Sequence, residues 1–242
     1  MDWVYYHDVM SRFTLRHWRG DVLEIPPQPS DMCRKEVYTP VRTAIGFPST
    51  NVDRLPSDYS MVANLALLAE LSENVLEKPL NAMCGQQIED YKGYIRILDW
   101  RVRNILIEYK NTDSQEQTVI AELFKLATLV YLNRVSGNIL DQADSIQANL
   151  NRAFALFSQM DSCERQYPLF ILGCEARTDE QRLTVLDLIS RTEQKNSSRS
   201  LNHVRILVQA LWAQDDLAEK ELDYWDKLSA IISSCTIIPS LV

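Results

Sequence analysis

A cysteine that directly follows a glycine at the end of an apolar run could act as a nucleophile. Residues 166–182, QYPLFILGCEARTDEQR, contain this arrangement at Gly173 and Cys174. If a strand turned sharply at Gly173 into a helix, the turn would be a nucleophile elbow and Cys174 the thiol of a hydrolase. A buried helix that carries an unreactive thiol leaves nearly the same pattern, so the surrounding elements must decide between the two.

The acidic pair Asp215 and Asp216, in the stretch DDLAE, is a second candidate site. All-α prenyl-diphosphate lyases bind magnesium through the carboxylates of such a pair. The Asn, Ser and Glu motif that should face the pair is not found in the sequence. Acids at the start of a helix also oppose its dipole, so we interpret the pair as the ordinary beginning of the last helix.

Metal and disulfide sites have little support. No cysteine pair forms C-x-x-C, and no histidine pair forms H-E-x-x-H or H-x-x-x-H. The residues concerned are widely spaced: Cys33, Cys84, Cys163, Cys174, Cys235, His7, His17 and His203. This pattern fits a reducing compartment, and we expect no cofactor and no metal in this chain.

Nucleic-acid and membrane binding are also disfavoured. The stretch HDVMSRFTLRHWRG, residues 7–20, combines basic and aromatic side chains that could contact phosphates, but Asp2 and Asp8 dilute its charge. We therefore expect a solvated face beside an aromatic core stripe. A formal net charge of −8 also opposes non-specific nucleic-acid binding, because counterion release needs clustered Lys and Arg. No apolar run approaches ~18 residues, and the amino terminus lacks the basic region of a signal peptide.

Proline and glycine placement predicts long helices. Prolines crowd residues 20–57, whereas residues 80–167 and 169–238 contain none, and only Gly85, Gly93, Gly137 and Gly173 follow position 57. A sheet-containing chain needs more turn punctuation. We therefore expect an all-α single domain of about eight to ten helices. We divide it into an amino-terminal helix (1–19), a proline-rich connector (20–57), a helical core (58–235) and a carboxyl-terminal tail (236–242).

Apolar periodicity places the helices of the core. The segment 120–134 is apolar nearly all round and should form a central helix that Gly137 ends in a left-handed conformation. The other apolar faces are Met61, Leu65, Leu68, Ser72 and Val75; Tyr94, Ile97, Leu98, Ile105 and Tyr109; Ile146, Leu150, Ala153, Phe154, Phe157 and Met160; and Leu217, Glu221, Tyr224, Trp225, Leu228, Ile231 and Ile232. Ser57 with Asp58, and Ser114 with Gln117, are candidate caps.

An all-α chain offers no parallel sheet on which a nucleophile elbow could stand. Residues 167–174 are therefore predicted to form a short buried helix with Pro168 in its first turn. Residues 175–178 should form a loop, and Thr178 with Gln181 should cap the next helix. Cys174 is then a small apolar filler of the core, because free cysteine is usually buried and no basic partner is near in sequence.

Five ordered blocks carry a family resemblance: WVYYHDVMSRFTLRHW, ELFKLATLVYLNR, ANLNRAFALFSQM, YPLFILGCEARTDEQR and VRILVQALWAQDD. Together they resemble the fungal-specific transcription factor domain, the regulatory region of fungal zinc binuclear-cluster transcription factors, over about positions 3–225. The most specific block comprises Tyr167, Pro168, Leu169, Phe170, Gly173, Cys174, Glu175 and Ala176, followed by an acidic helix start and Trp212. The resemblance implies a helical region.

The family's DNA-binding module, a six-cysteine zinc cluster, is absent from this sequence. We therefore expect either the carboxyl-terminal part of a longer regulator or a homologue without the cluster, with zinc bound only upstream and no DNA recognition by these residues. The resemblance implies a non-enzymatic nuclear regulator whose partners are coregulator proteins, a second copy of the chain, or a small-molecule effector between helices. The alternatives are an enzyme, either a lyase using Asp215 and Asp216 or a Cys174 hydrolase, and a plain helical scaffold.

Overall fold

The computed structural model describes residues 3–18, 59–76, 85–107, 115–195, 199–218, 222–235, 238–239 and 241, and these residues contain helices and no strand. The helices are α1 (Trp3–His17), α2 (Tyr59–Asn74), α4 (Gly85–Arg103), α5 (Gln115–Val135), α6 (Ala143–Gln159), α7 (Gln166–Cys174), α8 (Asp179–Lys195), α9 (Arg199–Leu217) and α10 (Tyr224–Ser233). The all-α prediction is confirmed. Within these ranges, no helix has the length and apolar character needed to cross a membrane.

Some sequence predictions lie outside the described residues. These are the proline-rich connector of residues 20–57 and the candidate caps at Ser57, Asp58 and Ser114.

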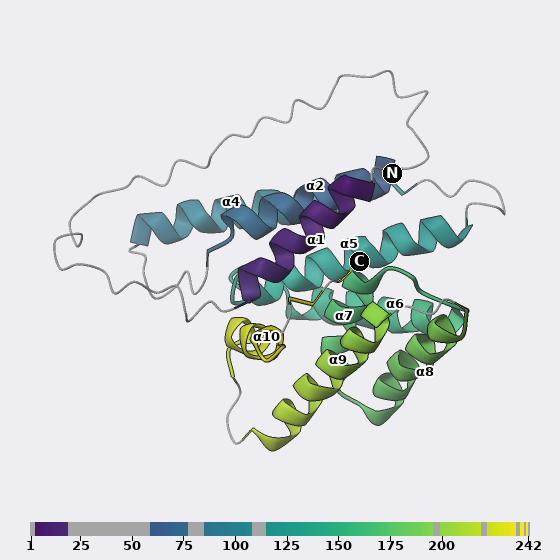
Figure 1. Cartoon of the computed structure of the whole chain (residues 1–242). Coiled ribbons are helices and arrows are strands. Elements are labelled where there is room, and N and C mark those ends of the chain that lie inside the picture. Colours follow the sequence, from purple (N-terminus) through teal and green to yellow (C-terminus); the bar gives the residue numbers. More distant parts are fainter. Residues whose placement is uncertain are drawn as a thin grey trace.

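Helix α5 lies between a layer of α1, α2 and α4 and the shorter helices below it (Figure 1). Most of its residues from Thr118 to Val135 are buried. A helix that is apolar all round needs neighbours on every side, and α5 packs against α2, α4, α6, α7 and α10. Just beyond its end, Gly137 has a φ of 63°, which glycine adopts without the steric penalty of a Cβ atom.

Helix α7 is buried along its whole length, and it packs against α5, α8 and α9. Pro168 lies in its first turn, as predicted, where the missing N–H breaks no helical hydrogen bond. Gly173 allows close approach, because a Cβ atom there would lie 3.2 Å from Val208 and 3.3 Å from Val185. The indole N–H of Trp212 on α9 donates to the Gly173 carbonyl at 2.9 Å.

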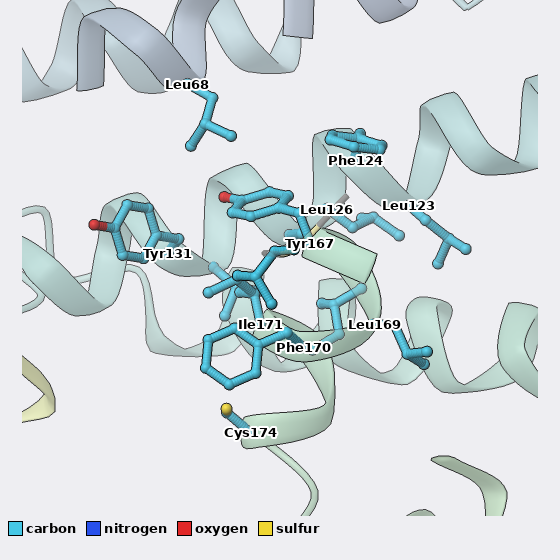
Figure 2. Close-up of a cluster of buried hydrophobic side chains, with 14 of the residues drawn as sticks. Leu68, Leu123, Phe124, Leu126, Tyr131, Tyr167, Leu169, Phe170, Ile171 and Cys174 are labelled. Atoms are coloured by element: carbon cyan, nitrogen blue, oxygen red, sulfur yellow. The ribbon is translucent and has the colours of Figure 1, made fainter. Parts of the chain in front are cut away.

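Aromatic side chains join α1, α5 and α7 in the core. Figure 2 shows Tyr167 of α7 with Tyr131 and Phe124 of α5 on either side. The Tyr167 ring centroid lies 5.5 Å from that of Phe124 and 5.2 Å from that of Phe13. Such pairs contribute about 0.5–1.5 kcal/mol each beyond the burial of their area, so they fix α1 and α7 against the central helix.

His17 connects α1 to two further helices through its ring nitrogens. Nε2 lies 2.7 Å from the Tyr131 hydroxyl of α5, and Nδ1 lies 3.4 Å from the Ser229 hydroxyl of α10. Burial, followed by the neighbouring Arg16, lowers the pKa of His17 well below 6.5. The Arg16 guanidinium lies 4.7 Å from the centre of the Trp225 ring of α10. His17 is therefore a neutral core residue at neutral pH.

The predicted face of α4 is wrong in detail. Ile97 was assigned to the apolar stripe but is 58% exposed, and Trp100 on the same side is 64% exposed. Tyr109, in the same predicted stripe, lies outside the described residues. The helix carries apolar residues on more than one side, so periodicity alone does not select the buried one. The core face consists of Tyr91, Ile95, Leu98 and Val102.

The predicted start of the last helix is also wrong. Leu217 ends α9 and is 84% exposed, whereas α10 begins at Tyr224. The Asp223 side chain accepts a hydrogen bond from the backbone N–H of Trp225 at 3.1 Å and so caps α10. Aspartate is a favoured residue at this position, so the last helix begins at Tyr224 and not at the acids Asp215 and Asp216, where the sequence pattern places its start.

Candidate functional site

Cys174 lies in the core and not on a strand-to-helix turn. It is 2% exposed, and it shares one side of α7 with Phe170, one turn earlier (Figure 2). Burial raises the pKa of its thiol well above the ordinary value, and Glu175 and Asp215 raise it further. A nucleophilic cysteine needs the opposite environment, a partly exposed and electropositive one. This geometry favours the neutral thiol.

Asp215 and Asp216 lie in the last turn of α9, not at the start of the last helix as predicted. The carbonyl end of a helix carries partial negative charge, so acids there are unfavourable unless cations compensate them. The structure supplies these cations from outside α9, and each acid has its own.

Asp215 lies between two cationic side chains. Arg177 Nη1 donates to its Oδ2 at 2.9 Å, and Lys227 Nζ of α10 lies 2.5 Å from its Oδ1, as an ion pair without hydrogen-bond geometry. Lys227 and Asp215 are both largely buried, with side-chain exposures of 8% and 11%. A buried charge without a partner is strongly destabilising. Asp215 and Lys227 therefore depend on each other and on Arg177 for charge compensation.

Asp216 forms a bidentate pair with Arg182 of α8, with N–O distances of 2.7 and 2.8 Å. The Arg182 hydrogen bonds lower the pKa of Asp216. The Arg182 guanidinium also lies 5.4 Å from the centre of the Trp212 ring. Both acids are therefore used in ion pairs, and the described residues contain no group of three or more His, Cys, Asp or Glu side chains placed to hold a metal ion.

The predicted cap of α8 is confirmed. The Gln181 backbone N–H donates to the Thr178 hydroxyl at 3.2 Å, and the Thr178 N–H donates to Gln181 Oε1 at 3.3 Å. This reciprocal capping box fixes the entry of α8. Residues 175–178 form the predicted loop. Arg177 lies in this loop and pairs with Asp215, and Arg182 lies in the first turn of α8 and pairs with Asp216.

Glu175 and Arg134 form an ion pair that the sequence interpretation missed. Arg134 donates from Nε and Nη2 to the Glu175 carboxylate at 3.1 and 2.7 Å. The Glu175 side chain is 2% exposed, so it requires this partner. The available signal was an acid placed directly after an almost wholly apolar helix, together with a cation at the end of a second helix.

A pocket of about 420 Å³ opens beside these pairs, and we call it the basic pocket. It lies between the end of α5, the loop after α7 and the start of α10. Its wall is formed by Asn133, Arg134, Gly137, Asn138, Arg177, Leu222, Asp223, Tyr224 and Lys227. Three cations from three separate segments thus face one hollow, and sequence spacing gave no hint of their meeting.

The amino-terminal basic stretch forms no phosphate-binding face in the part of α1 that the structure describes. Arg12 pairs with Asp8 and Glu73, and Arg16 donates to the backbone carbonyls of Leu71 and Val75. Phe13 is fully buried. The aromatic core stripe is present, but the predicted solvated face is wrong in part, because Arg12 and Arg16 attach α1 to α2 and His17 is fully buried.

Known proteins resemble the chain along its length. Residues 1–234 match the family described as fungal specific transcription factor domain. A protein named transcription factor iacI, from Pestalotiopsis fici, is 37% identical over 244 residues, an alignment that covers 100% of this chain and 58% of that relative. The chain therefore spans little more than half the length of this relative. No solved structure gives a significant match.

Proposed function

Because the chain belongs to the fungal specific transcription factor domain family, we propose that it is the regulatory domain of a nuclear transcription regulator that responds to a small-molecule effector. It acts through contacts with coregulator proteins or a second copy of itself. It performs no catalysis, and DNA recognition does not reside in these residues. The match over residues 1–234 is the observation that carries this proposal.

The environments of the candidate catalytic residues support a non-enzymatic role. Cys174 is buried where its thiolate is disfavoured. Asp215 and Asp216 are each bound to basic side chains. Metal-binding carboxylates would have to release these cations, and a nucleophilic thiol would have to reach solvent.

The basic pocket supports response to an effector. Its volume falls within the range of roughly 300–1,000 Å³ that is usual for small-molecule sites. Its walls come from α5, from the loop after α7 and from α10. A molecule bound there would contact three segments at once and could shift their relative positions.

A reporter assay tests the proposal. The whole chain is joined to an unrelated DNA-binding module whose site lies upstream of a reporter gene in a fungal host. We expect reporter transcription to differ from that given by the module alone, because a regulatory domain acts through partners once it is brought to a promoter. Leu188→Asp places a charge at a fully buried position of α8 and should abolish the effect.

Leu183→Asp is the matched control, because Leu183 lies on the same helix and is 66% exposed. This variant should remain folded by circular dichroism and retain the effect. A folded, nuclear fusion protein whose reporter output equalled that of the module alone would contradict a regulatory role. Turnover of a substrate by the chain would contradict the non-enzymatic part.

A further inference from the structure

The charges of the basic pocket are arranged in two layers. The acids that pair with its cations lie beneath the wall, since the side chains of Glu175 and Asp215 are 2% and 11% exposed. The guanidinium groups lie further out, with Arg134 and Arg177 exposing 36% and 54% of their side chains. A molecule in the pocket therefore meets the cationic side of each pair.

Asp223, the acid that lines the pocket, is hydrogen-bonded to the backbone. One of its carboxylate oxygens accepts a hydrogen bond from the Trp225 N–H and so caps α10. Lys227, one turn further along α10, is held at the wall by Asp215. The described wall thus presents three cations and a single acid, while Glu175 and Asp215 balance the total charge from beneath. A negatively charged occupant is favoured because the guanidinium groups lie outermost, and not by a net positive charge.

Neutral groups of the wall add hydrogen-bond donors. Asn138 Oδ1 accepts from Asn133 Nδ2 at 2.8 Å and from the Gln142 backbone N–H at 3.2 Å. With its oxygen used in this way, the NH₂ group is what the Asn138 amide offers to an occupant. Asn138 has a φ of 53° and follows Gly137, so the turn that presents this amide is conformationally specialised.

Tyr224 lines this pocket, but its hydroxyl is shielded from solvent and has no hydrogen-bond partner among the described residues. Burial raises its pKa well above 10, and Glu175 and Cys174 raise it further. It therefore remains a neutral donor. Solvent does not reach this hydroxyl, and the groups that raise its pKa are buried residues of the core. The donors that the pocket offers to an occupant are therefore those of Arg177 and Asn138.

From these features we propose that the basic pocket binds a small organic acid. Its carboxylate accepts hydrogen bonds from Arg177 and Asn138, and its apolar body lies against Leu222. A guanidinium group suits a carboxylate because its N–H groups match the two oxygens. The inference deepens the proposed function, on which it rests, by giving the effector a chemical class.

Binding is measured with benzoate and succinate as probes and with uncharged benzamide as the reference, at constant ionic strength. Each acid at about 10 mM should raise the Tm of the intact chain above the value in benzamide, because a molecule that binds only the folded state stabilises it. Isothermal titration calorimetry then gives the Kd, and Arg177→Gln should weaken it at least about tenfold.

Arg152→Gln is the matched control. Arg152 is 51% exposed and paired with Glu122 on α5, and neither residue lines the pocket. Arg177 is similarly 54% exposed and paired with Asp215. Both variants lose one exposed arginine from one ion pair, but only Arg177→Gln should lose affinity. Equal affinity in both variants would overturn the site.

The Tm of the empty Arg177→Gln variant separates binding from folding. It should lie close to the Tm of Arg152→Gln, while the Kd of Arg177→Gln for the acids rises. A lower Tm with an unaltered Kd would overturn the role of Arg177 and with it the site. If neither acid bound, or if inorganic phosphate bound as tightly as both, the carboxylate class would be wrong. Reporter output is independent of these probes, so regulation and ligand class can fail separately.

Discussion

At the scale of single residues, the buried groups that could take part in chemistry are kept unreactive by the side chains around them. Cys174 is kept as a thiol by burial and nearby acids, Glu175 is neutralised by Arg134, and Asp215 lies between two cations. A charge that leaves water without a partner costs several kcal/mol. The residues that resemble a catalytic set therefore hold α5, α7, α9 and α10 together.

Cys174 should react slowly with N-ethylmaleimide at pH 7 in the folded protein and quickly after denaturation. Cys235 is the internal comparison, since it is only partly buried, and should react faster in the folded state. Mass spectrometry of the peptides measures both rates in one sample. Rapid modification at a single site, lost in Cys174→Ala, would support a reactive thiolate instead.

Cys174→Ala should act through stability. The substitution removes one buried sulfur and leaves a small cavity, which costs on the order of 1 kcal/mol. Urea unfolding of the wild type and the variant measures this difference. A variant as stable as the wild type would show that the sulfur is not packed as the structure indicates.

At the scale of elements, α7 can be wholly buried because its neighbours approach its backbone closely. Gly173 lets Val185 of α8 and Val208 of α9 reach the helix, and Trp212 fills the same region while donating to the Gly173 carbonyl. Glycine is unfavourable inside a helix by roughly 1 kcal/mol relative to alanine, and close packing compensates for this here.

Gly173→Ala should destabilise the protein by about 1 kcal/mol, because the overpacking cost of roughly 1–3 kcal/mol exceeds the gain in helix propensity. Gly93→Ala is the control, since a Cβ atom at Gly93 in α4 would meet nothing within 4 Å. That variant should gain about 0.5–1 kcal/mol. Urea unfolding measures both, and a stabilising Gly173→Ala would show that the valines yield without cost.

At the scale of the whole molecule, distant parts of the chain close around the same core. His17 of α1 contacts Tyr131 of α5 and Ser229 of α10. The Tyr6 hydroxyl donates to the carbonyl of Leu241 at 3.4 Å, and Leu241 is fully buried although it lies within the predicted tail. The two ends of the sequence are therefore coupled to the stability of the centre.

Stability should fall as pH decreases below about 6.5. The pKa of His17 is lowered in the folded state, so the unfolded chain binds a proton that the folded chain does not. The contribution of neutral His17 to the free energy of unfolding is then fully present above the pKa of His17 in the unfolded chain. Below that pKa the free energy of unfolding decreases by up to about 1.4 kcal/mol per pH unit. Urea unfolding from pH 7.5 to 5.5 measures the slope.

His17→Gln isolates this contribution, because glutamine can still hydrogen-bond to Tyr131 but does not titrate. The other ionisable groups are unchanged, so the slope should become shallower in the variant. Identical slopes for wild type and variant would show that His17 is protonated in the folded protein.

The chain should not recognise DNA by itself. With a net charge of −8 and with the arginines of α1 paired or bonded to α2, the described surface offers α1 no basic stripe for the phosphate backbone. In a gel-shift assay at physiological salt we expect only weak binding and no preference for CGG half-sites. A sequence-dependent shift at nanomolar protein would contradict this expectation.

The sequence alone determined features that depend on nearby residues. The apolar character of α5, the left-handed Gly137, Pro168 in the first turn of α7 and the capping box of Thr178 with Gln181 involve interactions within about one or two helical turns. Such features follow from local sterics and hydrogen bonding, and the structure has them where the pattern placed them.

Only the tertiary structure decided which faces and charges meet. Arg134 and Glu175 are 41 positions apart, and Arg177 and Asp215 are 38 apart. The side on which α4 is buried and the position of the acids at the end of α9 likewise depend on neighbours distant in the chain. A helix pattern fixes the angle of each side chain about its own axis but not the partner opposite. The basic pocket, made from three separate segments, therefore exists only in the folded protein.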